Sequence, residues 1–296
     1  MFRNGSFKNI FSNNLIVIRM GLFDWFKNKK SPSKLETGRE DKSFATEENE
    51  NNILLAMPMF NGTDSYDLEA VVADLKNYWK VEISDISGDG QTATMNINGV
   101  LVALASMPAP IPTKEIENIA PHNYLWKTAL EDCKAHQCHA IVTVLSSKDV
   151  PVLERYKILT QLNASVLRTS KGIGIYQGTQ TLLFSKEIYL DFANFLLEDQ
   201  LPIQLWIYIG LVGSEAGSSI YTFGLKDFNK MELEVLDSTM EKMDLYDLLL
   251  AIVGYVVEQD MILQDGETIG FSAKQKIKIT ASKGKFLEGE TLKLEL

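Results

Sequence analysis

The sequence predicts an α+β protein that contains two similar units. Short apolar runs rich in β-branched residues end at turn signals such as Asn61-Gly62 and Asn98-Gly99, a pattern typical of strands and hairpins. Between them, apolar residues recur every three or four positions, which is typical of amphipathic helices. Apolar residues make up 45% and charged residues 23% of the chain, as expected of a folded protein, and 296 residues suffice for about two domains.

The first unit is predicted at residues 52–148, in the order strand, helix, three-stranded meander, helix, strand. It begins with an apolar strand at residues 53–60. Asn98-Gly99 predicts a type I′ hairpin turn within the meander, because both central residues of that turn need positive φ. We interpret the proline-rich residues 107–123 as a loop. This order of elements is close to the split β-α-β arrangement of ferredoxin-like domains.

A connecting helix is predicted at residues 149–170, and a second unit at residues 171–296. The elements expected in the second unit are a strand at 172–178, a helix at 185–198, strands at 204–213 and 218–225, and a helix that buries Leu245, Leu248, Leu249, Ile252 and Val256. Alternating runs near the C-terminus predict further strands. The predicted fold is therefore two tandem ferredoxin-like (split β-α-β) units, with a disordered N-terminal tail and a C-terminal β extension.

Residues 1–51 are predicted to form the disordered tail and linker. The apolar run "LIVI" is interrupted by Arg19 before any small-residue cleavage site, so no secretory signal is predicted. The sequence leaves open whether translation starts at Met1 or at Met20. The longest apolar stretches, "LPIQLWIYIGLVG" and "LYDLLLAIVGYVV", are too short or too close to acidic residues to span a bilayer. We therefore expect a cytoplasmic protein without stable membrane insertion.

The charge of the chain favours protein partners over nucleic acid. The formal net charge is −10; residues 1–50 contribute +2, which leaves −12 for the rest. A nucleic-acid binder needs clustered Lys and Arg to neutralise phosphates, and the folded part shows no such cluster. An acidic surface would instead attract a basic protein partner.

The segment "CKAHQCH" contains both cysteines and two of the three histidines, but its spacing does not predict a metal site. Cys133 and His136 can share a helical face, whereas Cys138 and His139 begin a strand and should point to opposite sides. His122 lies at the other end of the expected helix, roughly 20 Å away at 1.5 Å per residue. A zinc site needs three or four converging ligands, so we expect no metal and no other cofactor.

No nucleophile or phosphate loop is predicted either. In "GSEAG" the position of the serine in a G-x-S-x-G elbow is taken by Glu215. The pair Gly172 and Gly174 lies within a predicted strand and lacks the following helix of a phosphate-binding loop. Catalytic residues stay unknown, and whether the protein is an enzyme stays open.

Two polar stretches are candidates for lining a pocket, at residues 221–238 and at residues 265–276. Both bring polar groups together beside apolar anchors, which would suit a cleft. The alternative interpretation is an edge strand and a hairpin with solvated charged faces. The candidate ligand-binding residues are Tyr221, Thr222, Lys226, Glu232, Glu234, Glu267, Thr268, Ser272 and Lys274.

The stretches "GSSIYTFGLKDFNKMELEVLDS" and "LQDGETIGFSAKQKIKITASKG", with "ILLAMPMF" and "HAIVTVL", resemble a bacterial family known as domain of unknown function 4261. The resemblance covers roughly residues 52–296. It implies a bacterial, soluble protein, and it carries no activity, cofactor or catalytic residue to transfer.

Two functions remain as hypotheses. The first is a non-enzymatic protein-interaction module, because the surface is acidic, sheet edges are abundant and no catalytic constellation is evident. The alternative is a small-molecule-binding protein or hydrolase with a pocket between the two units, since ligand sites are common at such junctions.

Overall fold

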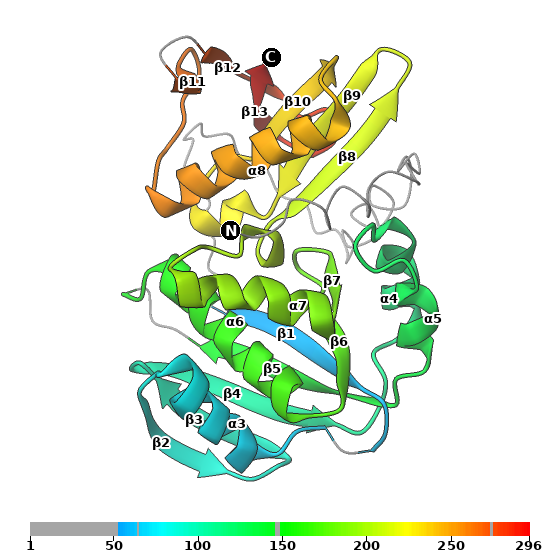
Figure 1. The fold of residues 1–296 in the computed structure, drawn as a ribbon, viewed down its shortest axis with the longest axis vertical. Coiled ribbons are helices and arrows are strands. Elements are labelled where there is room, and N and C mark those ends of the chain that lie inside the picture. The colour runs from blue at the N-terminus through cyan, green and yellow to red at the C-terminus, as the bar shows by residue number, and fades with distance from the viewer. Residues whose placement is uncertain (1–52, 64, 146–148, 273–274) are drawn as a thin grey trace, which may run out of the picture.

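The computed structural model describes residues 53–63, 65–145, 149–272 and 275–296, and it combines two β-sheets with six α-helices (Figure 1). This confirms the predicted α+β class. The tail and linker predicted at residues 1–51 lie outside the described residues, as does the candidate Lys274.

Sheet A has seven strands in the order β2-β3-β4-β5-β1-β6-β7. Its strands are β1 (Ile53–Phe60), β2 (Ile83–Gly88), β3 (Thr92–Ile97), β4 (Val100–Met107), β5 (Cys138–Leu145), β6 (Gly172–Gln177) and β7 (Leu182–Ser185). All six strand pairs are antiparallel. The predicted meander is confirmed as β2, β3 and β4, and the β3–β4 turn has positive φ at Asn98 (48°) and Gly99 (80°), as its sequence requires.

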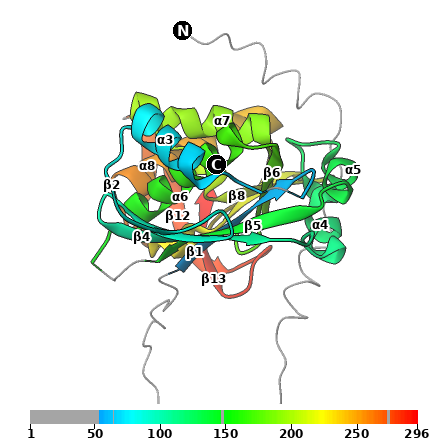
Figure 2. The same ribbon diagram turned by 90° about the horizontal axis from the view of Figure 1, so that it is seen from below.

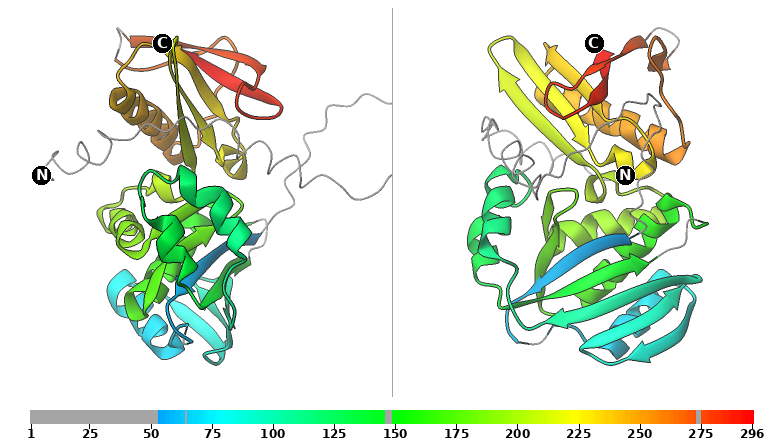
Figure 3. Two further views of the ribbon diagram at one scale, coloured as in Figure 1. Left: turned by 90° about the vertical axis from the view of Figure 1, so that its right-hand side faces the viewer. Right: turned by 180° about the vertical axis from the view of Figure 1, so that it is seen from behind.

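Three helices cover one face of sheet A: α3 (Leu68–Asp74), α6 (Val152–Thr169) and α7 (Lys186–Ala193). The alternation of the strands explains this asymmetry. Leu54, Val102 and Val144 lie in one cross-strand row on the covered face and are buried. The neighbouring row on the other face, Ile53, Leu101 and Leu145, is exposed or half-buried. Views from below and from behind show no helix over β4 and β5 on that face (Figures 2 and 3).

Two short helices, α4 (Thr113–Ile119) and α5 (Ala129–Lys134), lie beside sheet A and form a second, smaller core against β1, β6 and β7. The interpretation of residues 107–123 as a loop was therefore wrong over α4. Its prolines precede and follow the helix: Pro112 is the N-cap residue, and Ile116 and Ile119 face the small core.

Sheet B has six strands in the order β11-β12-β13-β10-β9-β8. Its strands are β8 (Tyr208–Ser214), β9 (Gly217–Phe223), β10 (Leu233–Ser238), β11 (Thr268–Ser272), β12 (Gln275–Lys283) and β13 (Glu290–Glu295). The predicted long helix is α8 (Lys242–Glu258), which packs against β8 and β9. The pair β10–β13 is parallel and the others are antiparallel.

The tandem ferredoxin-like arrangement is not confirmed. In a split β-α-β unit, helix-linked strands run parallel in one sheet, whereas sheet A is antiparallel throughout. In addition, residues 172–185, which the prediction assigned to the second unit, extend sheet A, because β6 pairs with β1 and β7 pairs with β6. The structure therefore divides its sheets between β7 and β8, while the predicted domain boundaries stay predictions.

The two sheets share one hydrophobic core. A single cluster of buried residues runs from β1, β4 and β5 through α6 to β9, β10 and α8. At the junction, Tyr156 of α6 stacks on Phe228, with ring centroids 4.8 Å apart, and Trp206 lies 5.7 Å from Tyr156. The junction is thus a packed aromatic boundary, and it positions the pocket described next.

Candidate functional site

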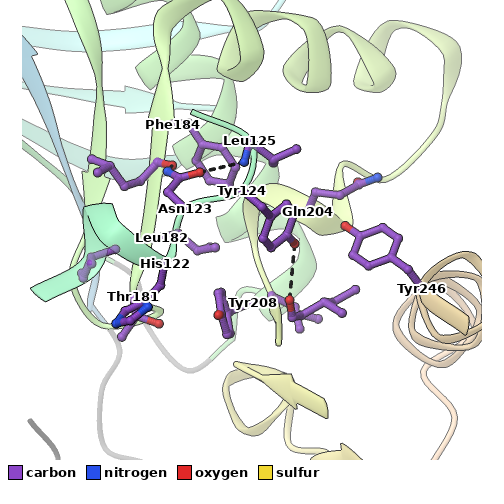
Figure 4. Close-up of a pocket in the computed structure, with 14 residues that line it drawn as sticks. His122, Asn123, Tyr124, Leu125, Thr181, Leu182, Phe184, Gln204, Tyr208 and Tyr246 are labelled. Atoms are coloured by element: carbon purple, nitrogen blue, oxygen red, sulfur yellow. Dashed lines mark hydrogen bonds between the residues drawn. The ribbon is translucent and has the colours of Figure 1, made fainter. Parts of the chain in front are cut away.

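A pocket lies where the edge of sheet A meets sheet B (Figure 4). Its wall comes from the segment before α5 (residues 122–125), from β7 and the turn before it (181–184), from residues 204–209 and from Tyr246 of α8. Its volume, measured as the space that the centres of water molecules can occupy, is about 40 Å³. One water needs ~10–15 Å³, and a cavity of ~150 Å³ holds one benzene ring, so the pocket has room for a few waters and for no guest larger than one ring.

Two polar atoms in the pocket wall have no hydrogen-bond partner among the described residues. They are Nδ1 of His122 and Oγ1 of Thr181, whereas the nearby Tyr208 hydroxyl interacts with that of Tyr221. Thr181 is only 4% exposed, so bulk water does not reach it freely. A buried polar group without a partner costs about 1–3 kcal/mol, and such groups are rare in native proteins. Their meeting in one pocket indicates that something outside the chain satisfies them.

Thr181 has a strained backbone. Its φ is +55°, in the left-handed region that β-branched residues almost never adopt. It is the last residue of the four-residue turn between β6 and β7, whose second half, Gln180 and Thr181, is buried while Thr179 is exposed. Strain of this kind costs about 1–3 kcal/mol and concentrates at binding sites.

A hydrogen-bond network holds this turn in place. Gln180 Nε2 donates to the Tyr156 hydroxyl (3.0 Å) and to Asp227 Oδ2 (2.8 Å), and the Tyr156 hydroxyl donates to the same carboxylate (2.7 Å). The network joins the β6–β7 turn to α6 and to the 3₁₀ turn Leu225–Phe228. Neighbouring structure therefore imposes the conformation of Thr181 and aims its hydroxyl at the pocket.

Asn123 fixes the opposite wall. Its Oδ1 accepts from the amides of Leu125 (3.0 Å) and Trp126 (2.9 Å), and its Nδ2 donates to the carbonyl of Leu183 in β7. The Asn123 side chain is thus fully used in tying this segment to the sheet, as Figure 4 shows. This fastening positions its neighbours His122 and Tyr124 at the pocket.

Tyrosines form the side of the pocket toward sheet B. The Tyr124 hydroxyl donates to the carbonyl of Ile209 (3.3 Å), and its ring meets Tyr246 edge to face. The ring of Tyr208 lies 6.1 Å from that of Tyr221. Burial raises the pKa of Tyr246 to about 12 and raises the pKa of Tyr208 further, so these phenols stay neutral at physiological pH.

The pocket has no charged wall. Among the described residues that line it, none is Asp, Glu, Lys or Arg. Burial lowers the pKa of His122, which favours its neutral imidazole. Every polar group that faces this space is therefore an uncharged hydrogen-bonding group.

The predicted carboxylates lie elsewhere, inside sheet B. Glu232 is 1% exposed and Glu234 0%. Glu232 accepts from the Thr222 hydroxyl (2.7 Å) and from the amides of Gly224 (2.8 Å) and Lys226 (3.3 Å). Burial raises the pKa of Glu232, because desolvation outweighs these hydrogen bonds.

Glu234 has the stronger set of partners. Its carboxylate accepts from the amides of Lys285 and Phe286 and from the Thr291 hydroxyl, and it pairs with Lys293 Nζ at 2.9 Å. Burial would raise the pKa of Glu234, but the two amides and the Lys293 ammonium together outweigh it and hold the pKa below its usual range. Both carboxylates hold turns against the sheet.

The remaining candidates do not converge on one cleft in the described part of the chain. Tyr221 is buried with its ring stacked on Phe286, Lys226 is exposed, and Glu267 is exposed and accepts from the amide of Gln264. Thr268 is exposed, and Ser272 ends β11 without a described side chain. None of the candidates lines the pocket. Whether any of them binds a ligand stays a prediction.

The cysteine and histidine side chains of residues 133–139 are engaged separately. His136 Nε2 accepts from the amide of Ile111 (2.8 Å), His139 Nδ1 contacts the carbonyl of Ala109 (2.7 Å), and Cys138 Sγ contacts the carbonyl of Gly62. Among the described residues, no group of three or more His, Cys, Asp or Glu side chains is placed to hold a metal ion. Burial raises the pKa of the Cys133 thiol to about 12, which makes it a poor nucleophile.

Sequence reasoning missed this pocket. The sequence placed His122 in a loop, Asn123 at the start of a helix and Thr181 between two predicted elements. These predictions use patterns of neighbouring residues, whereas the pocket forms only because β6 pairs with β1. The only sequence cue is the run of polar residues "GTQT" between two apolar stretches, which is also the ordinary composition of a solvated turn.

The fold and site together define a mixed α+β protein of two sheets with a pocket at their junction. The model of the family described as domain of unknown function (DUF4261) matches residues 221–295, so the segment from β9 to β13 is similar to that family. The predicted resemblance is confirmed over this segment, and its extension to residues 52–220 stays a prediction. No curated protein and no solved structure matches the chain.

Within the described ranges, we find no helix with both the length and the apolar character needed to cross a bilayer.

Proposed function

We propose that this protein binds a small molecule in the pocket between its two sheets. The observation that supports the proposal is the gathering of two unpartnered buried polar atoms, on His122 and Thr181, around one cavity. Small-molecule sites combine an apolar, aromatic lining with a few polar groups that orient the ligand. The sheet junction also agrees with the predicted alternative function, a binding pocket between two units.

The strained turn adds a second reason. A glycine or an asparagine at position 181 would carry less backbone strain than threonine, because those residues tolerate positive φ. A threonine held at φ +55° by the Gln180 network presents a hydroxyl group at the cost of strain. A role of the Thr181 hydroxyl in binding a ligand would explain why a strained threonine is present at this position.

A thermal-shift screen of the full chain against a library of small metabolites tests the proposal. We expect at least one compound to raise the melting temperature, and Thr181→Val to reduce that shift while leaving the fold intact, since valine keeps the shape and loses the hydroxyl. Thr143→Val is the matched control: Thr143 lies on sheet A away from the pocket and also loses a hydroxyl. If no compound stabilises the protein, or if both variants respond like the parent, water alone fills the pocket and the proposal fails.

Protein interaction is the second candidate function, and the uncovered face of sheet A favours it. Two cross-strand rows there, Ile53-Leu145-Leu101 and Leu55-Thr143-Ala103, carry no charge, and Ile53 and Leu101 are 56% and 43% exposed. Open apolar sheet faces commonly mark interaction surfaces. We propose a second copy of the chain as the occupant, because these two rows carry no charge to attract the basic partner that the overall charge suggests, whereas an apolar face is complementary to the same face of another copy.

Light scattering of the full chain at increasing concentration tests this second candidate. We expect a dimer that Leu101→Glu dissociates, because the charge would be buried at the interface. Ile86→Glu is the control, since Ile86 is 45% exposed on the edge strand β2. If the protein stays monomeric at all concentrations, a pull-down from cell extract decides between two conclusions. Recovery of a stoichiometric protein would point to a different partner, and recovery of nothing would exclude the interaction function.

A further inference from the structure

We propose that the ligand of the pocket is a small, uncharged, planar molecule with one ring and a hydrogen-bonding group on its edge. This inference rests on the proposed function and names the chemical class of its ligand. It follows from three properties of the described wall: its lack of charge, its aromatic side chains and its unpartnered polar atoms.

The lack of charge excludes ionic ligands. A carboxylate or ammonium group that enters the pocket loses its hydration, and none of the described lining residues offers an opposite charge in return. The Asp227 carboxylate accepts hydrogen bonds from Tyr156 and Gln180 and is not part of the pocket wall. Neutral ligands do not meet this penalty.

The aromatic wall favours a flat molecule. Phe184 comes from β7, Tyr124 from the segment before α5, Tyr208 from β8 and Tyr246 from α8, so rings approach the cavity from separate elements (Figure 4). Aromatic side chains pack best against other rings, offset or edge to face. The cavity of about 40 Å³ limits such a guest to roughly one ring.

The unpartnered atoms require a polar edge on the guest. The Thr181 hydroxyl can donate and accept, and His122 Nδ1 accepts or donates according to its tautomer. A phenolic hydroxyl or a heterocyclic N–H satisfies such groups, whereas a hydrocarbon ring would leave them unpaired. Sites built around buried hydrogen-bonding groups reject analogues that lack the matching group.

Calorimetric titration of the full chain with phenol, toluene and benzoate at pH 7.5 tests the inference. The three probes have nearly the same size and differ in polarity and charge. We expect phenol to bind, toluene to bind about 5- to 10-fold more weakly for want of the hydrogen bond, and benzoate not to bind detectably. Thr181→Val should weaken the binding of phenol about 5-fold and leave the binding of toluene unchanged, and Thr143→Val should change neither affinity.

The outcomes separate this inference from the proposed function. Benzoate or toluene binding as tightly as phenol would overturn the ligand class while leaving a small-molecule site in place. Failure of all three probes would also overturn it if a library compound still binds in a manner that depends on Thr181. Failure of the probes and of the whole library would remove the proposed function itself.

Discussion

At the scale of single residues, the most unusual position in the described chain is Thr181, where a β-branched side chain occupies left-handed backbone. Replacement by asparagine should relieve the strain, since asparagine tolerates positive φ and fits the same space approximately. We expect Thr181→Asn to raise the free energy of unfolding by about 1 kcal/mol, because relief of strain outweighs the loss of one buried methyl. Urea denaturation measures the change.

The same variant tests whether strain serves binding. Thr181→Asn should lower the thermal shift that a bound ligand produces, giving a more stable and less responsive protein. Thr181→Val separates the two effects, because it keeps the strain and removes only the hydroxyl. A loss of stability in Thr181→Asn would mean that packing around the side chain, and not backbone strain, determines this residue.

Glu232 and Glu234 provide a second test, because their pKa values shift in opposite directions. The lowered pKa of Glu234 contributes stability that is present above pH 4.5 and is lost as the pH falls through the folded-state pKa. Glu234→Gln should therefore cost about 3–5 kcal/mol at pH 7, since Lys293 is left buried without its partner, and this cost should shrink on acidification.

The stability contribution of Glu232 depends on pH with the opposite sign. Its raised pKa means that the folded state binds more protons, so the parent protein loses stability as the pH rises from 4.5 through the folded-state pKa. Glu232→Gln removes that loss, so the free energy of unfolding of the variant should rise relative to that of the parent over the same pH window. Unfolding curves between pH 4 and 8 measure both variants. If the stability of the two variants changed with pH in the same way, the opposite pKa shifts of Glu232 and Glu234 would be contradicted.

The residue scale also shows what the sequence could predict. The stretch from Tyr221 to Glu234 was singled out because polar groups gather beside apolar anchors, and they do gather there. What spacing cannot show is that chain amides, at Gly224 and Lys285 among others, bind those carboxylates inside the fold. Such partners come from turns distant along the chain.

At the scale of elements, strand β8 contains two glycines with different surroundings. A Cβ at Gly210 would lie 2.3 Å from the ring of Tyr221, whereas at Gly213 the nearest atom is Lys242 Nζ at 3.6 Å. Gly210→Ala should displace Tyr221 from its stack on Phe286, and we expect a loss of about 2–3 kcal/mol. Gly213→Ala, three residues along the same strand, should change stability by less than about 0.5 kcal/mol.

Chemical denaturation of the two variants tests this expectation, and ligand response extends it. Tyr208 neighbours Tyr221 and also lines the pocket, so Gly210→Ala should lower the ligand-induced thermal shift as well. Equal stability of the two alanine variants would show that the Tyr221 ring moves aside freely.

Elements with strong local signals were predicted well. The meander was predicted because Asn98-Gly99 fixes its turn chemically, and α6 and α8 because long apolar periodicities have no competing interpretation. Strand β7 was missed because four residues, "LLFS", directly precede helix α7 and extend its apolar pattern. Helix α4 was missed because prolines flank it, although they lie outside the helix itself.

At the scale of the whole molecule, strand pairing was the part that sequence could not supply. Apart from the missed helix α4, the order of elements in residues 53–145 agrees with the prediction, but β5 returns antiparallel to β4 after α4 and α5, and β1 then pairs with both β5 and β6. Element order alone is compatible with several pairings, and the choice depends on side-chain packing between distant segments. The pocket exists only in the observed pairing, which is why no local pattern reveals it.

The junction between the sheets leads to a prediction about cooperativity. Tyr156 of α6 donates a 2.7 Å hydrogen bond to Asp227 and stacks on Phe228, so sheet A and sheet B share a charged hydrogen bond within one continuous core. We expect the protein to unfold in urea as one transition, with coincident curves from tryptophan fluorescence and far-ultraviolet circular dichroism.

Tyr156→Phe tests the strength of that link. The variant keeps the aromatic stack and removes the hydroxyl, so the free energy of unfolding should fall by about 1.5–3 kcal/mol while the two probes stay coincident. Tyr78→Phe is the matched control, because the Tyr78 hydroxyl bonds Asn194 on the exposed surface and its loss should cost less than about 0.5 kcal/mol. If the parent shows two separate transitions, or if Tyr156→Phe costs no more than the control, the sheets fold independently. A pocket between independently folding sheets would widen and close with their relative motion, and ligand binding would then couple them.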